Sequence, residues 1–327
     1  MNTEQHEREP RAPWQLSVAK EYAVPMAIVI AGAMIAVSYY LVQTGAGSGA
    51  RFAVQNAPAG ALQEAVLPTR GVELPVTWGD LGKKLVEAGA IDASAMESLY
   101  RDRGGMPTEY RVLLTGASDK KLVITQDNAG YLLNLLWALG LANTNPILED
   151  KTEMMNPGYG GAGNFASTGG WTIAKGDAMN HYNMHSLVAL TADQQKLVDK
   201  VSRGIFRPCC GNSTHFPDCN HGMAMLGLLE FMASQGVSEK DMYKAALAVN
   251  SYWFPDTYLT IAMYMQGKGV AWQDVSPKEM LGAEYSSGAG FQNISSQVNV
   301  PSNRGGGGCG VDAGAPVAPK QQSGCGI

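Results

Sequence analysis

Cysteines and histidines are concentrated in one short stretch of the chain. The run FRPCCGNSTHFPDCNHGMAM, residues 206–225, holds three of the five cysteines and two of the five histidines. Thiolates and imidazoles are the side chains that bind zinc and copper, and thiolates also form disulfides and exchange electrons. The composition of this run therefore fits a metal site, a redox centre or a disulfide-stapled loop.

The first choices for metal ligands are Cys209, Cys210, Cys219 and His221, and the last two directly precede the apolar run GMAMLGLLEFMA. That apolar run predicts a buried helix, with Asp218 or Asn220 as its N-cap. The partial positive charge at the start of a helix favours the deprotonated forms of a thiol and an imidazole. Those are the forms that bind metals, so this end of the helix suits a metal site.

The second choices for ligands are the remaining histidines of the region: His181, His185 and His215. His181 and His185 are four residues apart, which on a helix places both rings on one face. A predicted helix at 191–206 separates this pair from the cysteines and must fold back to bring the two groups together. The alternative for the pair is a role as surface or capping histidines.

Methionines add to the case for copper. Four of them flank the candidate ligands: Met179, Met184, Met223 and Met225. Thioethers together with thiolates select soft ions such as Cu(I). Methionine at helical spacing is also an ordinary core residue, so the metal stays either copper or zinc.

A disulfide is the main alternative to a metal. Cys219 could pair with Cys209 or Cys210 and close a loop of about ten residues in an oxidising compartment. The adjacent pair Cys209 and Cys210 is harder to explain as staples alone, because neighbouring residues seldom bridge without backbone strain. A thiol redox centre is the third alternative.

Part of this region resembles a known family. The segments RPCCGN, PDCNHG and MASQGVSEKDMY, within residues 206–243, are similar to exported proteins of the PCYCGC-motif family. In that family a Pro-Cys and Cys-Gly cluster precedes an Asp-Cys and a following helix. One cysteine of the family's cluster is lacking here, and the order of His and Cys after it differs. The resemblance implies an exported module with metal or thiol chemistry.

The elements that must position these residues are predicted to be mainly α-helical. Apolar residues at spacings of three and four predict helices over 77–91, 92–104 and 127–142. Thr191, Ser238 and Ser276 are predicted N-caps of three more. Residues 110–125 contain two short β-prone runs around a Gly-Ala-Ser-Asp turn, which predict at most one small hairpin.

An apolar stretch near the N-terminus predicts a membrane anchor. Residues 23–42 carry no charged side chain and have about the length that a helix needs to cross a bilayer. Three basic residues precede the stretch and Arg51 alone follows it closely, so we expect the N-terminus in the cytoplasm and the main domain outside. A cleaved signal peptide is the alternative, because small residues at 44–50 could form a cleavage site.

The expected organisation follows from these segments. Residues 1–21 form a cytoplasmic tail, 22–43 a single-pass transmembrane anchor, 44–73 a linker, 74–286 an extracytoplasmic helical domain with the Cys/His site, and 287–327 a disordered Gly-rich tail with Cys309 and Cys325. The formal net charge is −5, and no Lys/Arg-rich patch is present to neutralise phosphates. Nucleic acid is therefore excluded as a partner, which leaves the membrane and an exported protein.

Motifs of well-known enzymes are missing from the sequence, among them His-Glu-x-x-His, Gly-x-Ser-x-Gly and Cys-x-x-Cys, so an enzymatic role is not favoured. The sequence predicts a membrane-anchored extracytoplasmic protein that binds copper or zinc through its Cys/His cluster. The alternatives are a disulfide-stabilised scaffold or binding protein and a thiol–disulfide redox protein.

Overall fold

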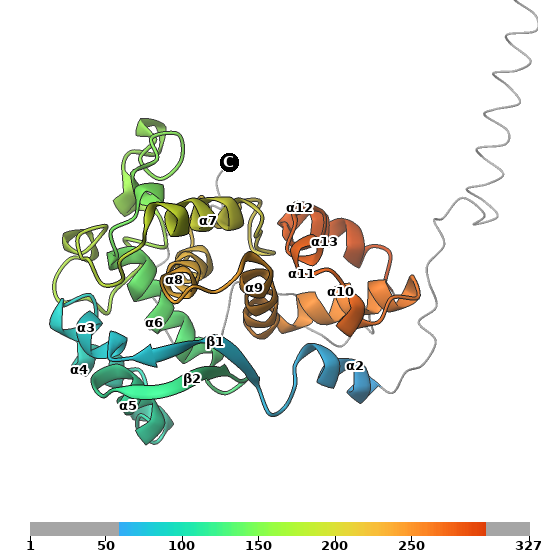
Figure 1. Ribbon diagram of the computed structural model, residues 1–327, viewed down its shortest axis with the longest axis horizontal. Coiled ribbons are helices and arrows are strands. Elements are labelled where there is room, and N and C mark those ends of the chain that lie inside the picture. The colour runs from blue at the N-terminus through green and yellow to red at the C-terminus, as the bar shows by residue number, and fades with distance from the viewer. Residues whose placement is uncertain (1–58, 299–327) are drawn as a thin grey trace, which may run out of the picture. The chain divides into compact units, whose positions relative to one another are not determined.

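The computed structural model, which describes residues 59–298, confirms the mainly α class that the helical periodicity predicts (Figure 1). Its α-helices are α2 (Ala59–Val66), α3 (Leu81–Glu87), α4 (Ala93–Ser98), α5 (Thr108–Thr115), α6 (Ala129–Ala142), α7 (Ala192–Arg203), α8 (Asn220–Ser234), α9 (Glu239–Trp253), α10 (Pro255–Gly267), α11 (Pro277–Met280), α12 (Ala283–Ser286) and α13 (Gly288–Ser295). Short 3-10 helices lie between them: η1 (Arg101–Arg103), η2 (Pro146–Glu149), η3 (Pro157–Tyr159), η4 (Ala162–Asn164), η5 (Ala178–Asn180) and η6 (Trp272–Asp274). The strands are β1 (Val72–Gly79) and β2 (Ser118–Ile124).

Helices α6 and α8 form the centre of the hydrophobic core. Nearly every residue of both helices is buried, as their apolar sequences require. A helix that is apolar all round is stable only when other elements cover it on every side. Helices α7 and α9 and strand β1 contact α8, and α9 also contacts α6 (Figure 1).

Two glycines let these central helices cross closely. A Cβ atom on Gly140 of α6 would lie 2.0 Å from the carbonyl oxygen of Met223, and one on Gly227 of α8 would lie 2.3 Å from that of Leu136. Carbon cannot approach backbone oxygen so closely, so only glycine fits at either position. The crossing fixes α8 and thereby positions its N-terminal turn.

The two strands pair over a long sequence distance. Strand β1 is antiparallel to β2, with Val72 opposite Ile124 and Gly79 opposite Ser118. The single small β unit is as predicted, but its first strand is not, because residues 108–115 form α5 with Tyr110 and Leu114 buried on one face. The sequence of residues 108–115 is compatible with a strand or a helix, and burial of one helical face in the core favours the helix. The predicted helix at 77–91 likewise begins only at α3, after β1 has ended.

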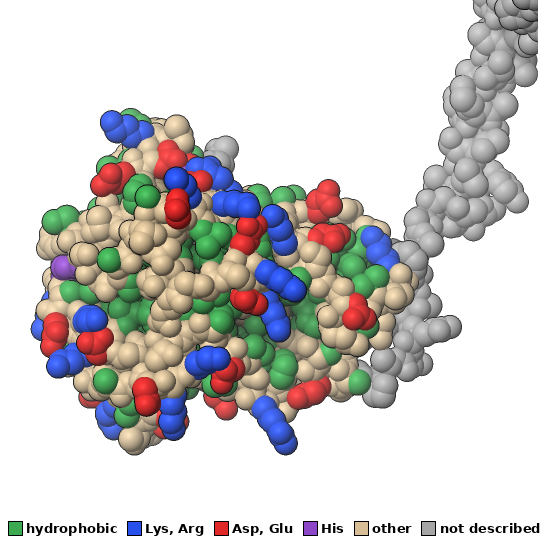
Figure 2. All heavy atoms as spheres, viewed as in Figure 1, with side chains coloured by type: hydrophobic (Ala, Val, Ile, Leu, Met, Phe, Trp, Pro, Cys, Tyr) green, Lys and Arg blue, Asp and Glu red, His purple; other side chains and the backbone are tan. Residues whose placement is uncertain are grey.

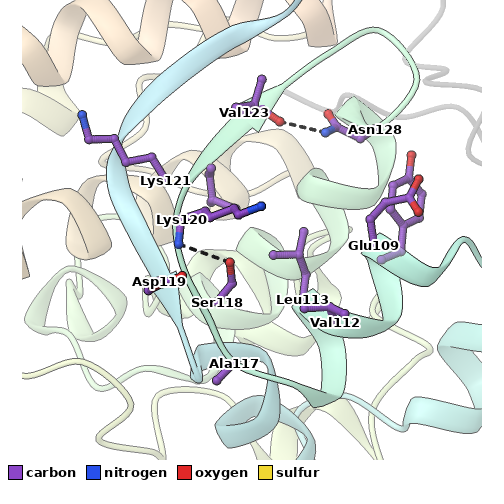
Figure 3. A pocket seen from close by; sticks show the side chains of 12 residues that line it. Glu109, Val112, Leu113, Ala117, Ser118, Asp119, Lys120, Lys121, Val123 and Asn128 are labelled. Atoms are coloured by element: carbon purple, nitrogen blue, oxygen red, sulfur yellow. Dashed lines mark hydrogen bonds between the residues drawn. The ribbon is translucent and has the colours of Figure 1, made fainter.

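A groove of about 450 Å³ lies between α5 and β2 (Figure 3). The side chain of Asn128 closes one end of it by donating a hydrogen bond to the carbonyl oxygen of Val123 at 2.8 Å. Neither cysteine nor histidine is among the described residues that line the groove. The residues with metal or thiol chemistry therefore lie elsewhere in the domain.

The predicted helix caps are confirmed with one exception. The side chains of Thr191, Ser238 and Ser276 each accept a hydrogen bond from a backbone N–H of the first turn, at α7, α9 and α11. At α8 the N-cap is Cys219 itself, so the prediction of Asp218 or Asn220 is wrong by one residue. The sulfur of Cys219 takes the place that an oxygen usually fills.

The folded part extends beyond the expected domain limits at both ends. Helix α2 lies within the expected linker, and the Tyr252 hydroxyl donates a hydrogen bond to the Pro68 carbonyl oxygen at 2.7 Å. Helix α13 lies within the expected tail and buries Ile294. A few buried apolar residues suffice to dock each short helix, although the composition around them is typical of loops.

Two expectations concern residues that the structure does not describe. The tail and anchor at 1–43 lie outside the described residues, as do Cys309 and Cys325. Within residues 59–298, no helix combines the length and apolar character that a membrane span requires. On the face shown in Figure 2, basic and acidic side chains are interspersed.

Candidate metal centre

The connection between α7 and α8 carries the three cysteines. Its backbone is held by a bridge between Phe206 and Ser213 and by a hydrogen bond from the Phe206 N–H to the Leu281 carbonyl oxygen at 2.8 Å. The N–H of Gly288, at the start of α13, donates to the carbonyl oxygen of Cys210 at 2.8 Å. These bonds fasten the connection to the end of α11 and to the start of α13.

Three first-choice ligands meet at the first turn of α8. One ligand atom each of Cys209, Cys219 and His221 lies within 4.8 Å of the others. The two sulfurs are 3.8 Å apart, whereas a disulfide bond measures about 2.05 Å. In a tetrahedral zinc site with Zn–S bonds of about 2.3 Å, two thiolate sulfurs lie about 3.8 Å apart. The geometry thus fits two thiolates bound to one ion.

His221 is buried beside the cysteines without a conventional partner. The residue is 1% exposed, and its ring lies 4.4 Å from that of Phe254 and 5.8 Å from that of Trp253, centre to centre. Neither ring nitrogen makes a hydrogen bond of good geometry among the described residues, although the ring is close enough to the Cys219 thiol to help lower the pKa of that thiol. A buried unpaired nitrogen of this kind costs about 1–3 kcal/mol. A bound ion would give one of them a partner.

The surroundings of Cys219 lower the pKa of its thiol. Hydrogen bonds with the thiols of Cys209 and Cys210 hold its pKa well below the usual range, and the Arg207 charge adds to this effect against the opposing effect of burial. The N–H of Gly222 also donates to its sulfur at 3.4 Å. These contacts favour the thiolate of Cys219.

Cys210 behaves in the opposite way. Its hydrogen bond with Cys209 lowers its pKa, but the hydrogen bond with Cys219 and burial outweigh that effect, so the pKa is raised. Its sulfur lies within 4.8 Å of the Cys219 sulfur and of a carboxylate oxygen of Asp218. Cys210 is thus a thiol at the edge of the cluster.

Arg207 supplies a buried positive charge that the sequence analysis did not identify. Its guanidinium donates to the carbonyl oxygens of Ser213 and Phe216 at 2.7 and 3.1 Å, and to Asp218 Oδ1 at 2.6 Å. Burial opposes its charge, yet the neighbouring thiols and carboxylate raise its pKa further above the usual value. The only signal in the sequence is its place directly before Pro208 and Cys209.

The helix accommodates this guanidinium because residue 222 is glycine. A Cβ atom on Gly222 would lie 2.6 Å from the Cζ atom of Arg207. Asp218, the partner of Arg207, also accepts a hydrogen bond from Asn212 at 2.8 Å. Because both carboxylate oxygens are engaged, Asp218 is a partner of the arginine rather than a free ligand.

His215 belongs to a separate cluster. Its Nδ1 lies 2.7 Å from Glu153 Oε2, and its Nε2 lies 3.0 Å from Asp199 Oδ1. Burial lowers its pKa, but the carboxylate of Glu153 outweighs burial and the net shift is upward. Its ring is within 4.8 Å of ligand atoms of Asp150 and Glu153. The structure therefore places His215 in an ion-pair cluster, apart from the three-residue cysteine–histidine cluster.

His181 and His185 form a pair of their own. They lie in a turn after η5 rather than on one helix, and His181 Nδ1 is 3.1 Å from His185 Nε2. His181 Nε2 is 3.0 Å from the Lys175 carbonyl oxygen, which can only accept, so His181 donates there and accepts from His185. Burial, followed by the charge of His181, lowers the pKa of His185. The two rings are thus hydrogen-bonded to each other.

The methionines divide between the core and the surface. Met223 and Met225 are fully buried on α8, where they fill the core around α6. Met179 and Met184 are exposed. The two on α8 are thus core residues, the ordinary alternative to copper ligands.

Comparison with known proteins gives no match to any family model, curated protein or solved structure. The similarity of residues 206–243 to the PCYCGC-motif family stays a prediction. The chemistry of the site is therefore argued from its own geometry.

Proposed function

We propose that this chain binds one soft or borderline metal ion through Cys209, Cys219 and His221, with zinc as the first choice and copper as the second. The observation that carries the proposal is His221. Its buried imidazole makes no hydrogen bond of good geometry through either nitrogen, yet it lies within 4.8 Å of two sulfurs. An unpaired buried nitrogen lowers the stability of a protein without a metal. In a protein with a metal, the same nitrogen beside a thiolate can coordinate the ion.

Charge balance favours a divalent ion. Arg207 and Asp218 form an ion pair and neutralise each other. Two thiolates then neutralise Zn²⁺, whereas they would leave a net negative charge with Cu(I). Because uncompensated charge is costly in a buried site, zinc fits better than copper.

Cys210 is the proposed fourth ligand. Its sulfur already lies within 4.8 Å of the Cys219 sulfur, and a rotation of its side chain would bring it to the ion. A bound cation lowers the pKa of a coordinating thiol. Cys210 would therefore lose its proton when the ion binds and complete a tetrahedral site of three sulfurs and one nitrogen. The net charge of this site would be −1 with Zn²⁺ and −2 with Cu(I), so the same argument still favours zinc.

The proposed setting is the outer side of a membrane. It rests on the apolar stretch at 23–42 and on the basic residues before it. A disulfide-stabilised scaffold and a thiol redox protein are the alternative functions, and the following experiment separates them from metal binding.

The test compares the full-length chain with the variant His221→Phe. Phenylalanine keeps an aromatic ring against Trp253 and Phe254 but has no nitrogen. Elemental analysis after purification under reducing conditions, with zinc and copper supplied, should find one zinc per wild-type chain. The variant should bind zinc about 10–100-fold more weakly. Its metal-free form should be at least as stable to unfolding as wild type, because two unpaired nitrogens are removed.

The matched control is His185→Phe, which removes a histidine outside the cysteine–histidine cluster and should leave zinc affinity unchanged. Absence of stoichiometric zinc or copper from the wild-type chain would overturn the proposal. Thiol titration then distinguishes the alternatives, since a scaffold has few titratable thiols and a redox protein has a pair that titrates reversibly.

A further inference from the structure

Two of the proposed ligands are also placed for disulfide formation. The sulfurs of Cys209 and Cys219 are 3.8 Å apart, so they need to approach by about 1.7 Å to reach disulfide length. Cys209 lies in a turn outside the helices, where side-chain rotation and a small backbone shift supply such a movement. Both residues are partly exposed.

The Cys219 sulfur is the one placed at a helix terminus. It caps α8, where the partial positive charge of a 15-residue helix and the N–H of Gly222 face its sulfur. The guanidinium of Arg207 is fully buried and lies against the same helical turn, close to Gly222. We therefore assign Cys219 as the sulfur that attacks the oxidant.

We propose that a peroxide converts Cys209 and Cys219 to a disulfide, and that this oxidation releases the metal ion. The chain would then hold its ion under reducing conditions and give it up under oxidising ones. The release step rests on the proposed function, whereas the choice of the two cysteines does not.

The reaction takes two steps that balance. The thiolate of Cys219 attacks one peroxide oxygen, so an S–O bond forms, the O–O bond breaks and hydroxide leaves. The thiolate of Cys209 then attacks the sulfur of this sulfenic acid, the S–S bond forms and a second hydroxide leaves. Two thiolates are thereby oxidised by two electrons in total, and one hydrogen peroxide is reduced to two hydroxides. Two of the proposed metal ligands are consumed.

Cys209 is favoured over Cys210 as the partner of Cys219 on two grounds. The sulfurs of Cys209 and Cys219 are already in contact at 3.8 Å. The backbone of Cys210 is fixed to α13 through its hydrogen bond with Gly288.

The test uses full-length, zinc-loaded protein in which Cys309 and Cys325 are replaced by alanine, so that only the three clustered thiols react. One equivalent of hydrogen peroxide is added, zinc release is followed with a coloured chelator, and the disulfide is located by peptide mass mapping. We expect one zinc released per disulfide and a map that shows Cys209 joined to Cys219. Cys210→Ala and Cys209→Ala each lack a proposed ligand, so both are tested without metal. Cys210→Ala should still form this disulfide, and Cys209→Ala should form none among the clustered thiols.

Three results would overturn the inference: a disulfide that includes Cys210, a disulfide in the metal-free Cys209→Ala variant, or zinc that stays bound after the disulfide has formed. Failure of the proposed function is distinguishable from these, because a wild-type chain that binds no metal can still be oxidised and mapped. In that case a disulfide between Cys209 and Cys219 supports the thiol pairing and removes the metal-release step, and any other pair overturns both.

Discussion

Glu230 is a carboxyl group buried in the middle of α8. It accepts hydrogen bonds from the side-chain amides of Asn143 and Asn145, at 3.1 and 2.5 Å. The amide orientations are fixed, because Asn143 Oδ1 accepts from the N–H of Leu187 and Asn145 Oδ1 accepts from the N–H of Ile147. Both amide NH₂ groups must therefore point at Glu230, which has to present an acceptor to each.

The variant Glu230→Gln should be less stable than wild type at pH 5, by about 1–3 kcal/mol, because an NH₂ group would face the NH₂ of one asparagine. Burial raises the pKa of Glu230 from 4.5 to about 8. Between these values the folded chain keeps a proton that the unfolded chain releases, so wild-type stability falls as pH rises through this window, by up to about 1.4 kcal/mol per pH unit. Glutamine does not titrate, so the difference in unfolding free energy between wild type and Glu230→Gln should narrow from pH 5 to pH 8.

Denaturant unfolding of both proteins at several pH values measures this gap. The control is Asn183→Ala, which alters a neighbouring asparagine and keeps Glu230. The difference in unfolding free energy between this variant and wild type should be the same at every pH. A gap between wild type and Glu230→Gln that is constant or widens with pH would show that Glu230 is ionised in the folded chain.

The sequence predicts the type of the site residues better than their environment. Cys209, Cys219 and His221 could be selected as ligands because they cluster and precede an apolar helix. Burial of His221 against Phe254, and the buried charge of Arg207, depend on elements that are distant in the chain. The same holds for His215, which the fold directs to Glu153.

At the scale of elements, the crossing of α6 and α8 has a sharp mutational consequence. Gly227→Ala should destabilise the domain by about 3 kcal/mol or more, because the added Cβ meets the Leu136 carbonyl oxygen and the Gly140 nitrogen with no flexible side chain to yield. The matched control is Gly60→Ala in α2, where a Cβ meets nothing within 4 Å. This variant should be more stable than wild type by about 0.5–1 kcal/mol. Thermal unfolding of the two variants checks both signs, and a Gly227→Ala protein with wild-type stability would contradict the close crossing.

Local signals explain which elements could be predicted. Helix α7 has the N-cap Thr191 and helix α9 has the N-cap Ser238. Each also has apolar residues at helical spacing, so both signals are local to the helix. The pairing of β1 with β2 has no such signal, because the strands are distant in sequence and each is short. Strand β1 was therefore missed, and a hairpin within 110–125 was predicted in its place.

At the scale of the whole molecule, the proposed site lies where several helices meet. His221 on α8 contacts Trp253, the last residue of α9, and Phe254 before α10. Cys210 is bonded through its backbone to Gly288 of α13. A metal held by Cys209, Cys219 and His221 would fasten the α7–α8 connection to the first turn of α8, against which the junction of α9 and α10 packs. Metal binding should therefore stabilise the whole domain.

Removal of the metal should lower the melting temperature of the full-length chain. A ligand at 100 times its Kd stabilises the folded state by about 2.7 kcal/mol, which for a domain of this size corresponds to about 5–10 °C. The shift should shrink as pH falls from 7 to 5, because protons compete with the ion for the thiolates. Thermal unfolding with zinc and with a chelator, at both pH values, measures this shift in melting temperature.

Two variants serve as controls. Cys219→Ser removes a proposed ligand and should melt at the same temperature with zinc as with chelator, whereas His185→Phe should keep the full shift. A wild-type melting temperature that zinc leaves unchanged at pH 7 would mean that the cysteine–histidine cluster stabilises the domain without an ion.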